Sequence, residues 1–386
     1  CIRDRGNSSA VGIEYRDLLK SIEVDDVLLL DDGKMHLRVD SVSDSDIDCT
    51  VLIGGTLSSR KCVNKLGGGI AAPALTEKDK ADIRAMEAIK PDFVAVSFVA
   101  AVQDIEEARG LLQDANVDAA IISKIERAEV VADRDLLNSI IDACEGVMVA
   151  RGDLGIEVGD AELIGIQKDL ISRTRKRDRM VITATQMMES MITNSIPTRA
   201  EVFDVANAVL DGTDAVMLSS ETAMGDHPVQ AVEAMGRICE GSEIENSAFL
   251  INDIQKKSCL RTDEAIALAC MQTAENIKAQ AIAALTESGK TALWMSRVNH
   301  TIPIFALTTH IDTLRKVTLY RGVYPAHLKT INTNHAQVNK DAINVLTNLG
   351  VAKDNDLVII TKGDLAGIQG GTNAMKIVKV GYLVES

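Results

Sequence analysis

Residues 119–153 read AAIISKIERAEVVADRDLLNSIIDACEGVMVARGD, and this stretch decides the predicted fold. It holds two short apolar runs that end in charged residues, the first in Lys124-Ile125-Glu126 and the second in Arg151-Gly152-Asp153. The residues between the runs have the length and pattern of a helix, so the stretch predicts a strand, a helix and a second strand. Such a unit places its strands parallel in one sheet, with their carboxyl ends at the same edge.

The same alternation continues on both sides of this stretch. Strands are expected at residues 92–98, 119–126, 146–153, 180–186 and 214–221. The three strands not yet described also end in polar residues, namely Ser97, Thr185-Gln186 and Ser219-Ser220-Glu221. Repeated strand–helix units predict an α/β fold of the (β/α)8 TIM-barrel type, whose active site lies where the strands end. Only about five of the eight strands are found, so we expect an open sheet or further strands upstream.

Two further domains flank the predicted barrel. Before it we expect a small β domain, with strands at 27–30, 35–39 and 49–53 and a hairpin turn at residues 31–34. Thr76, with an acid three residues later, should cap the first helix of the barrel. After residue 242 the pattern predicts a doubly wound α/β domain behind a polar linker at 246–258. The predicted domains are therefore 1–69, 70–242 and 243–386.

The composition narrows the class of protein. The 386-residue chain is 46% hydrophobic and carries a formal net charge of −15, which argues against nucleic acid or an anionic membrane as its main partner. Its seven cysteines lack paired or zinc-type spacing, as is typical of a reducing compartment. We find no run apolar enough to span a bilayer and no signal region, so we expect a soluble cytoplasmic protein.

Lys124, Glu126 and Asp153 form the strongest candidate site. Lys124 and Glu126 lie two residues apart on a strand, so both side chains leave the same face of the sheet. Two carboxylates on neighbouring strands suit Mg²⁺ or Mn²⁺, which prefer oxygen ligands. The alternatives are a structural ion pair at the rim of the barrel and an ordinary Gly-Asp turn. Agreement between neighbouring strands favours the metal site.

Thr185 ends the next strand and offers a hydroxyl to the same edge. It could donate to a substrate carboxylate or relay a proton, or it could bond its own backbone. The methionines at 187, 188 and 191 are expected in the core. None of the six histidines pairs with a Cys or Ser as a nucleophile's base, which disfavours a Ser-His-Asp enzyme.

A second candidate site lies at residues 285–292, LTESGKTA, which predict a strand, a hydroxyl-rich turn and a helix start. Thr286, Ser288, Gly289, Lys290 and Thr291 would supply hydroxyls, a cation and free amides to a phosphate group. The alternative is a plain helix cap. Because this loop belongs to a different domain from Lys124, we expect it to serve regulation rather than catalysis.

Several long motifs, in order and in register, resemble the pyruvate kinase family of the bacterial type. They are Ile121 to Glu129 (IISKIERAE), Val149 to Gly155 (VARGDLG), Ala184 to Met191 (ATQMMESM), Pro197 to Val202 (PTRAEV) and Met217 to Ala223 (MLSSETA). The resemblance covers nearly everything from Val11 onward. It implies a barrel with an inserted small β domain and a carboxyl-terminal regulatory domain.

The resemblance also implies roles for residues. Glu126 and Asp153 would hold Mg²⁺ or Mn²⁺, Lys124 would neutralise the phosphoryl group in flight, and K⁺ would assist. Amides at Gly152 and Asp153, with Thr185, would bind phosphoenolpyruvate, and Lys124, Thr185 and Arg151 would form the catalytic group. ADP and ATP would be the nucleotides, residues 286–291 would bind a phosphorylated activator, and the enzyme would be a homotetramer acting in the last step of glycolysis.

The chain departs from the family at its beginning. It starts at Cys1 without Met, and the first three barrel strands of the family are not in it. We therefore expect an amino-terminally truncated member whose activity is absent or impaired. Two alternatives remain open: a non-catalytic remnant that binds the effector, and another Mg²⁺-dependent barrel enzyme acting on phosphoenolpyruvate or pyruvate, such as a lyase. A requirement for ADP would distinguish the kinase from the lyase.

Overall fold

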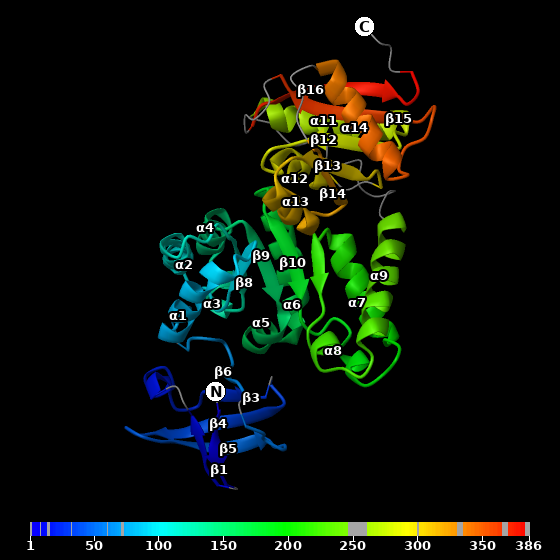
Figure 1. The fold of residues 1–386 in the computed structure, drawn as a ribbon. Helices are drawn as coiled ribbons and strands as arrows, with labels where there is room; N and C mark the ends of the chain where they lie inside the picture. Colours follow the sequence, from blue (N-terminus) through cyan, green and yellow to red (C-terminus); the bar gives the residue numbers. More distant parts are fainter. Residues whose placement is uncertain are drawn as a thin grey trace. The chain divides into compact units, whose positions relative to one another are not determined.

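The computed structural model describes residues 2–7, 9–13, 16–31, 33–59, 61–70, 73–245, 261–298, 301–329, 335–364 and 370–382 (Figure 1). The chain forms two compact units, residues 1–189 with 217–223, and residues 190–216 with 224–386. The linker predicted at 246–258 lies outside the described residues, and the three predicted domain boundaries stay a prediction. No helix in the described ranges is both long and apolar enough to cross a membrane.

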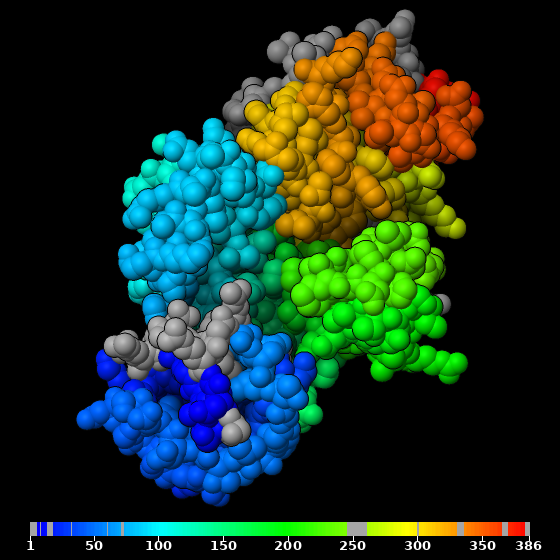
Figure 2. All heavy atoms as spheres, turned by 60° about the horizontal axis from the view of Figure 1, so that its bottom comes forward, coloured from blue at the N-terminus to red at the C-terminus, as the bar shows by residue number. Residues whose placement is uncertain are grey.

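The first unit begins with the small β domain, drawn in blue in Figure 2. Its strands are β1 (Ile2–Gly6), β2 (Val11–Ile13), β3 (Val27–Leu30), β4 (Met35–Val42), β5 (Ile47–Ile53) and β6 (Val63–Lys65), with a 3-10 helix at Arg16–Lys20. β1 and β2 pair with each other, and the other four form an antiparallel sheet in the order β5-β4-β3-β6. The predicted β3–β4 hairpin is confirmed. Its apolar face packs around Leu28, Leu30 and Val39.

The predicted strands of the barrel are present and form one sheet in the order β11-β10-β9-β8-β7. They are β7 (Phe93–Val96), β8 (Ala120–Ile125), β9 (Gly146–Ala150), β10 (Met180–Ala184) and β11 (Ala215–Met217). The pairs from β7 to β10 are parallel, and the apolar side chains of the strands are buried against those of the helices. The prediction of a parallel sheet with crossover helices is therefore confirmed.

Helices connect these strands. They are α1 (Glu77–Ala85), α2 (Val102–Asp114), α3 (Ala128–Ala132), α4 (Arg134–Ala143), α5 (Arg151–Val158), α6 (Asp160–Lys176), α7 (Arg199–Asp211), α8 (Ser220–Ala223) and α9 (Pro228–Glu245), with 3-10 turns at Met86–Ala88 and Glu189–Ile192. Thr76 caps α1 as predicted, because its hydroxyl accepts the Asp79 N–H while the Asp79 carboxylate accepts the Thr76 N–H.

Two strand ends differ from the prediction by three residues or more. Strand β9 stops at Ala150, and Arg151 begins α5, so Asp153 lies in the first turn of a helix. The helix dipole stabilises a carboxylate at this position. Strand β11 covers only 215–217, and residues 220–223 form α8. The strands thus end three and four residues earlier than the apolar pattern indicated, because apolar content does not mark where ladder hydrogen bonds stop.

The α/β domain belongs to the second unit and has a five-stranded sheet in the order β14-β13-β12-β15-β16. Its elements are α11 (Thr262–Ile277), β12 (Ala281–Leu285), α12 (Lys290–Ser296), β13 (Ile304–Thr308), α13 (Ile311–Lys316), a 3-10 turn (Val317–Leu319), β14 (Val323–His327), α14 (His335–Asn348), β15 (Leu357–Gly363) and β16 (Thr372–Lys379). Alternate residues of β12 enter two separate apolar clusters, so both faces of the sheet are covered. The doubly wound prediction is confirmed, with β16 antiparallel at the edge and α14 not anticipated from the sequence.

Candidate active site

Lys124 and Glu126 meet at the carboxyl end of β8. The Lys124 ammonium lies 2.7 Å from Glu126 Oε1 and donates to Ser97 Oγ, just beyond β7, at 3.0 Å. The Glu126 side chain is 1% exposed and that of Lys124 is 26% exposed. The parallel register, in which Val96 pairs with Ser123, places these strand ends side by side. The structure therefore brings together Ser97, Lys124 and Glu126, as the sequence predicted. The Lys124 ammonium stays partly exposed and could contact a ligand.

Glu126 is a buried carboxylate with unused capacity. Its Oε2 accepts the Phe98 N–H at 2.7 Å, whereas Oε1 faces Lys124 without hydrogen-bond geometry. Burial raises the pKa of Glu126; the ammonium of Lys124 lowers it, and the negative charge of Asp153 raises it further. A bound cation would lower the pKa of Glu126 again, because it would stabilise the charged form of the carboxylate.

Asp153 is the second carboxylate of the site. It follows the end of β9, one strand along from Glu126, and its Oδ1 lies 3.4 Å from the amide nitrogen of Asn64, a buried residue of β6. The sequence analysis missed Asn64, which is 89 residues away and carries no motif of its own. The β domain thus contributes a polar group to the barrel site within the same compact unit.

These residues suit a divalent ion that is held by few protein ligands. Among the described residues no group of three His, Cys, Asp or Glu side chains has metal-site geometry, so Glu126 and Asp153 would be two ligands of an incomplete set. The Oε1 of Glu126, which lies beside the Lys124 ammonium but accepts no hydrogen bond, fits such a role. Mg²⁺ commonly binds one or two carboxylates and takes its other ligands from substrate phosphates and water. The donor set therefore fits the predicted metal.

Thr185 lies in a strained turn at the end of β10. Its φ is +66° and that of Gln186 is +52°, in the left-handed region that such side chains rarely adopt. The Thr185 hydroxyl accepts the Gly152 N–H at 2.7 Å and donates to the Ala184 carbonyl at 2.7 Å. The backbone alternative for this hydroxyl is thus present, and it links β10 to the start of α5. Strain of this kind is concentrated at functional sites.

Arg151 holds this strained turn. Its guanidinium is buried and donates to the Ala184 carbonyl at 3.3 Å and to the Thr185 carbonyl at 2.7 Å. These contacts satisfy backbone oxygens that the left-handed turn directs away from the sheet. Arg151 therefore has the contacts of a positioning residue, and a direct catalytic role for it stays a prediction.

Comparison with known proteins identifies this arrangement. Residues 1–232 match the family model described as "Pyruvate kinase, barrel domain", and residues 264–378 match "Pyruvate kinase, alpha/beta domain". The chain belongs to the pyruvate kinase family. It is 48% identical over 379 residues to pyruvate kinase II of Salmonella typhimurium, which covers 98% of this chain and 79% of the relative.

Other pyruvate kinases match over a similar length. The enzyme of Buchnera aphidicola from Acyrthosiphon pisum is 49% identical over 98% of this chain and 79% of its own. The enzyme of Dictyostelium discoideum is 36% identical over 98% of this chain and 76% of its own. Pyruvate kinases are phosphotransferases, so the predictions of family, fold class and enzyme class are confirmed.

Glu221 contacts the backbone that follows the Thr185 turn. It is 2% exposed; its Oε1 accepts the Met188 N–H at 3.1 Å and its Oε2 accepts the Ser219 N–H at 2.8 Å. The polar residues predicted at 219–221 therefore include a carboxylate, that of Glu221, which holds the backbone after Thr185 by hydrogen bonds. Met188 itself is fully buried, as expected.

Glu157 is a buried carboxyl that the sequence analysis missed. It lies on the last turn of α5, is 8% exposed, and its Oε2 accepts the Ala128 N–H at 2.8 Å. Burial raises its pKa to about 7; the bond from Ala128 lowers it and the nearby Glu129 carboxylate raises it further. Its backbone carbonyl accepts the Gly67 N–H, in the glycine triplet 67–69 that joins the β domain to the barrel.

The raised pKa predicts a pH-dependent cost to stability. The folded state holds a proton on Glu157 up to about pH 7, whereas the unfolded chain releases it near the ordinary value, so stability falls as pH rises from 5 to 8. Glu157→Gln should remove this cost, and its stability advantage over the parent should grow by about 2 to 3 kcal/mol across that range. Urea midpoints at each pH measure it. Exposed Glu106→Gln is the control, and an equal advantage at pH 5 and pH 8 would contradict the prediction.

The predicted effector loop turns between β12 and α12. The Thr286 hydroxyl accepts the Gly289 N–H at 2.9 Å, and Gly289 has a φ of +81° where an added Cβ would lie 2.7 Å from a Val317 methyl carbon. Lys290 is exposed, whereas Thr291 is buried and shares a hydrogen bond of 2.9 Å with Thr372. In the predicted set Lys290 is thus exposed, Thr286 and Ser288 are half-buried, and Gly289 and Thr291 are buried.

The loop also has a contact that the sequence did not predict. Glu287, between Thr286 and Ser288, pairs with the His310 ring at 2.6 Å, and its carbonyl accepts the Thr313 hydroxyl at 2.7 Å. The carboxylate that would repel a phosphate is therefore held by a partner from the neighbouring segment. No sequence signal marked His310 because it lies 23 residues further along the chain.

Proposed function

We propose that this chain transfers the phosphoryl group of phosphoenolpyruvate to ADP, giving pyruvate and ATP. The observation that supports the assignment is the Lys124 ammonium, 26% exposed, beside the buried Glu126 carboxylate and near Asp153. Phosphoryl transfer needs positioning and neutralisation of the charge on the moving group more than covalent chemistry by the protein. An ammonium next to two metal-binding oxygens supplies that neutralisation.

Each residue has one task in this proposal. Glu126 and Asp153 would hold Mg²⁺ or Mn²⁺, which neutralises phosphate oxygens and orients the substrate when bound. Lys124 would contact the oxygens of the phosphoryl group, where charge is spread in the transition state. Ser97 orients the ammonium along the strand ends, because its hydroxyl oxygen accepts a hydrogen bond from one of the three N–H groups.

The substrate carboxylate would bind between α5 and the Thr185 turn. The Gly152 N–H now donates to Thr185 Oγ1, and the Thr185 hydroxyl donates to the Ala184 carbonyl. A substrate carboxylate would accept hydrogen bonds from both groups in place of these two internal bonds. Gly152 allows this approach because a Cβ there would lie 3.6 Å from the Thr185 oxygen. The Thr185 hydroxyl, now bonded to the substrate, would stand near the carbon that receives a proton when enolpyruvate becomes pyruvate.

The test is an assay of pyruvate and ATP formation from phosphoenolpyruvate, ADP and Mg²⁺. We expect both products in equal amounts, and no pyruvate when ADP is left out. Pyruvate formation without ADP would favour another reaction of phosphoenolpyruvate. Effector binding without any turnover would favour a non-catalytic remnant.

The loop at 286–291 is proposed to bind a phosphorylated activator, a sugar phosphate or a nucleoside monophosphate. Ser288→Asp with Lys290→Glu should weaken activation at low phosphoenolpyruvate by about 100-fold or more in effector concentration, because two groups that favour a phosphate become repulsive. Glucose 6-phosphate and AMP are the probes. Lys353→Glu, an exposed charge reversal in the same domain, is the control, and unchanged activation in the double variant would contradict this role.

A homotetramer and a K⁺ requirement are proposed from the family. Helices α7 and α9 are adjacent, and their part of the sequence is coloured green in Figure 2. Three of their apolar side chains suit a subunit interface, because Phe203, Val229 and Val232 are 74%, 63% and 56% exposed. Analytical ultracentrifugation tests the assembly. Turnover in K⁺ compared with Na⁺ at equal ionic strength tests the alkali ion.

A further inference from the structure

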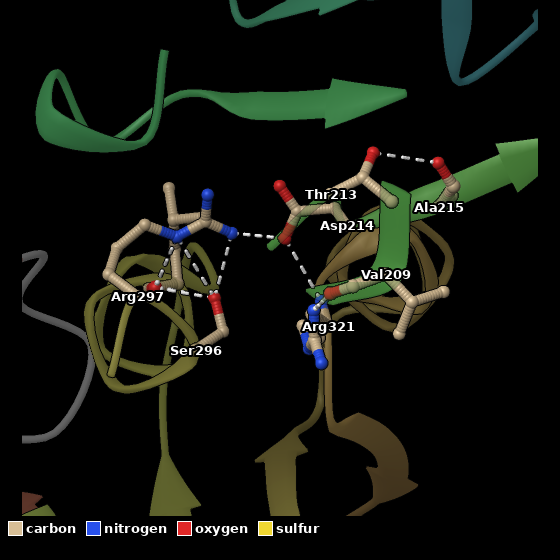
Figure 3. Close-up of polar contacts among 8 residues, drawn as sticks. Val209, Thr213, Asp214, Ala215, Ser296, Arg297 and Arg321 are labelled. Atoms are coloured by element: carbon tan, nitrogen blue, oxygen red, sulfur yellow. Dashed lines mark hydrogen bonds and ion pairs between the residues drawn. The ribbon is translucent and has the colours of Figure 1, made fainter. Parts of the chain in front are cut away.

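A buried cluster of charges lies within the second compact unit. Asp214, whose side chain is fully buried, is paired with the guanidinium of Arg297, which is 5% exposed. The backbone N–H of Arg321 donates to the same carboxylate oxygen at 3.1 Å. Figure 3 shows Asp214 held between segments that carry the two arginines. Two segments of the α/β domain thus converge on one aspartate of the barrel sequence.

Arg297 is fixed to the end of α12. It directly follows this seven-residue helix; its Nη2 donates to Ser296 Oγ at 3.0 Å and its Nε to the Leu293 carbonyl at 3.4 Å. The helix begins at Lys290, in the proposed effector loop. A movement of α12 therefore carries the guanidinium with it, because the side chain is bonded to the helix's own last turn.

Asp214 is equally fixed to the barrel segment. It directly precedes β11, and β11 leads to Ser219 and Glu221. The Glu221 carboxylate accepts the N–H groups of Ser219 and of Met188, which closely follows the strained turn at Thr185. Covalent bonds and hydrogen bonds thus form an unbroken series from the last turn of α12 to the backbone beside Thr185.

Arg321 adds two further hydrogen bonds to the cluster, one through its backbone N–H and one through its guanidinium. Its Nη1 donates to the carbonyl of Val209, on α7, at 2.5 Å, and burial lowers its pKa. The buried Arg297 guanidinium pairs with the Asp214 carboxylate, and the half-buried Arg321 places a second positive charge near it, with the acid Glu243 also close to Arg321. A buried ion pair stabilises a fold little compared with apolar packing, but it strongly penalises arrangements that separate the partners. The cluster therefore favours one relative placement of α12 and β11.

We propose that the Asp214–Arg297 pair is a positioning device that couples α12 to the Thr185 turn, so that ligand binding at either end changes the other. Coupling of this kind is reciprocal, since each ligand must change the affinity of the other by the same factor. The inference rests on the proposed function for the identity of the barrel ligand, phosphoenolpyruvate. It does not need a known effector.

The chain carries its own reporter for this coupling. Trp294 is its single tryptophan, lies on α12, and has the Arg261 guanidinium 5.3 Å from its ring centre. We expect phosphoenolpyruvate with Mg²⁺ to change Trp294 emission saturably, with half-saturation at the KM for phosphoenolpyruvate. In Asp214→Asn/Arg297→Met, which leaves neither charge buried alone, the change should fall at least tenfold while kcat stays within threefold.

Matched variants distinguish coupling from general disturbance. Asp169→Asn/Arg173→Met removes an ion pair of 2.6 Å within α6 and should leave the Trp294 response intact. Arg297→Lys keeps the charge but loses the fork, and should retain only part of the response. If the double variant at Asp214 does not fold, this conservative variant still decides, because a full response in it would overturn the proposal.

Three results would count against the coupling. Normal turnover with an unresponsive Trp294 in the parent enzyme would overturn it, and so would a full response in the Asp214→Asn/Arg297→Met variant. Effects of the single changes on KM that add up to that of the double change would show that the pair acts without coupling. Absence of turnover in the parent would count against the proposed function, while a Trp294 response to phosphoenolpyruvate that depends on the pair would still support the coupling.

Discussion

Lys124→Met should lower kcat by about 10³-fold or more while KM for phosphoenolpyruvate changes little. The ammonium faces the phosphoryl group, whose charge it stabilises chiefly in the transition state, so its loss should fall on kcat. Metal binding should survive, because removing Lys124 frees the carboxylate oxygen of Glu126 that it pairs with. Steady-state kinetics give the first result, and Mn²⁺ titration followed by electron paramagnetic resonance gives the second.

The control for this change is another paired lysine. Lys80, on α1, pairs with Glu77 and Glu107 at the protein surface, and Lys80→Met should leave kcat within twofold. A Lys124→Met enzyme that keeps a tenth or more of the parent kcat would show that the ammonium serves the fold. The Lys124–Glu126 contact would then be the structural ion pair considered from the sequence.

Glu126→Gln and Asp153→Asn should each weaken Mn²⁺ binding by about 10²-fold and lower kcat/KM by at least that factor. Each change keeps the shape of the side chain but removes a negative charge from a site with only two carboxylates. Calorimetric titration of Mn²⁺ measures affinity directly, without reliance on turnover. The affinity for Mn²⁺ should fall further in the variant that carries both changes.

Asp169→Asn is the matched control, because it neutralises an exposed carboxylate on α6. An unchanged Mn²⁺ affinity in Asp153→Asn would remove Asp153 from the metal site. Its contact with Asn64 would then be the main role of the carboxylate. Melting temperatures of all variants should be compared, since loss of Glu126 removes the acceptor of the Phe98 N–H.

The strands and their order could be predicted because the apolar runs are short, regular and separated by helical stretches. The polar groups at the ends of β8, β9 and β10 followed from the same pattern, since parallel strands end at one edge. Where each strand stops did not follow. The start of α5 at Arg151 depends on backbone hydrogen bonds that hydrophobicity does not report.

Contacts between segments that are distant in the chain could not be predicted from the sequence. Asn64 and Asp153 are 89 residues apart, and Glu157 is buried beside Ala128 only after the helices pack. Arg151 stands in a motif with Asp153, yet its guanidinium is bonded to carbonyls of β10 and the turn after it. A motif predicts which residues assemble, whereas the direction of each side chain depends on packing that is set elsewhere in the chain.

The glycine triplet at 67–69 has a consequence for the acidity of the barrel site. All three residues have positive φ, from +77° to +89°, and a Cβ on Gly68 would lie 2.8 Å from Glu157 Oε2 and 3.0 Å from Glu129 Oε2. The missing carbon atom therefore leaves room for two carboxyl groups to approach one peptide. The left-handed backbone of the joint between the β domain and the barrel, and the raised pKa of Glu157 beside Glu129, depend on the same absent side chain.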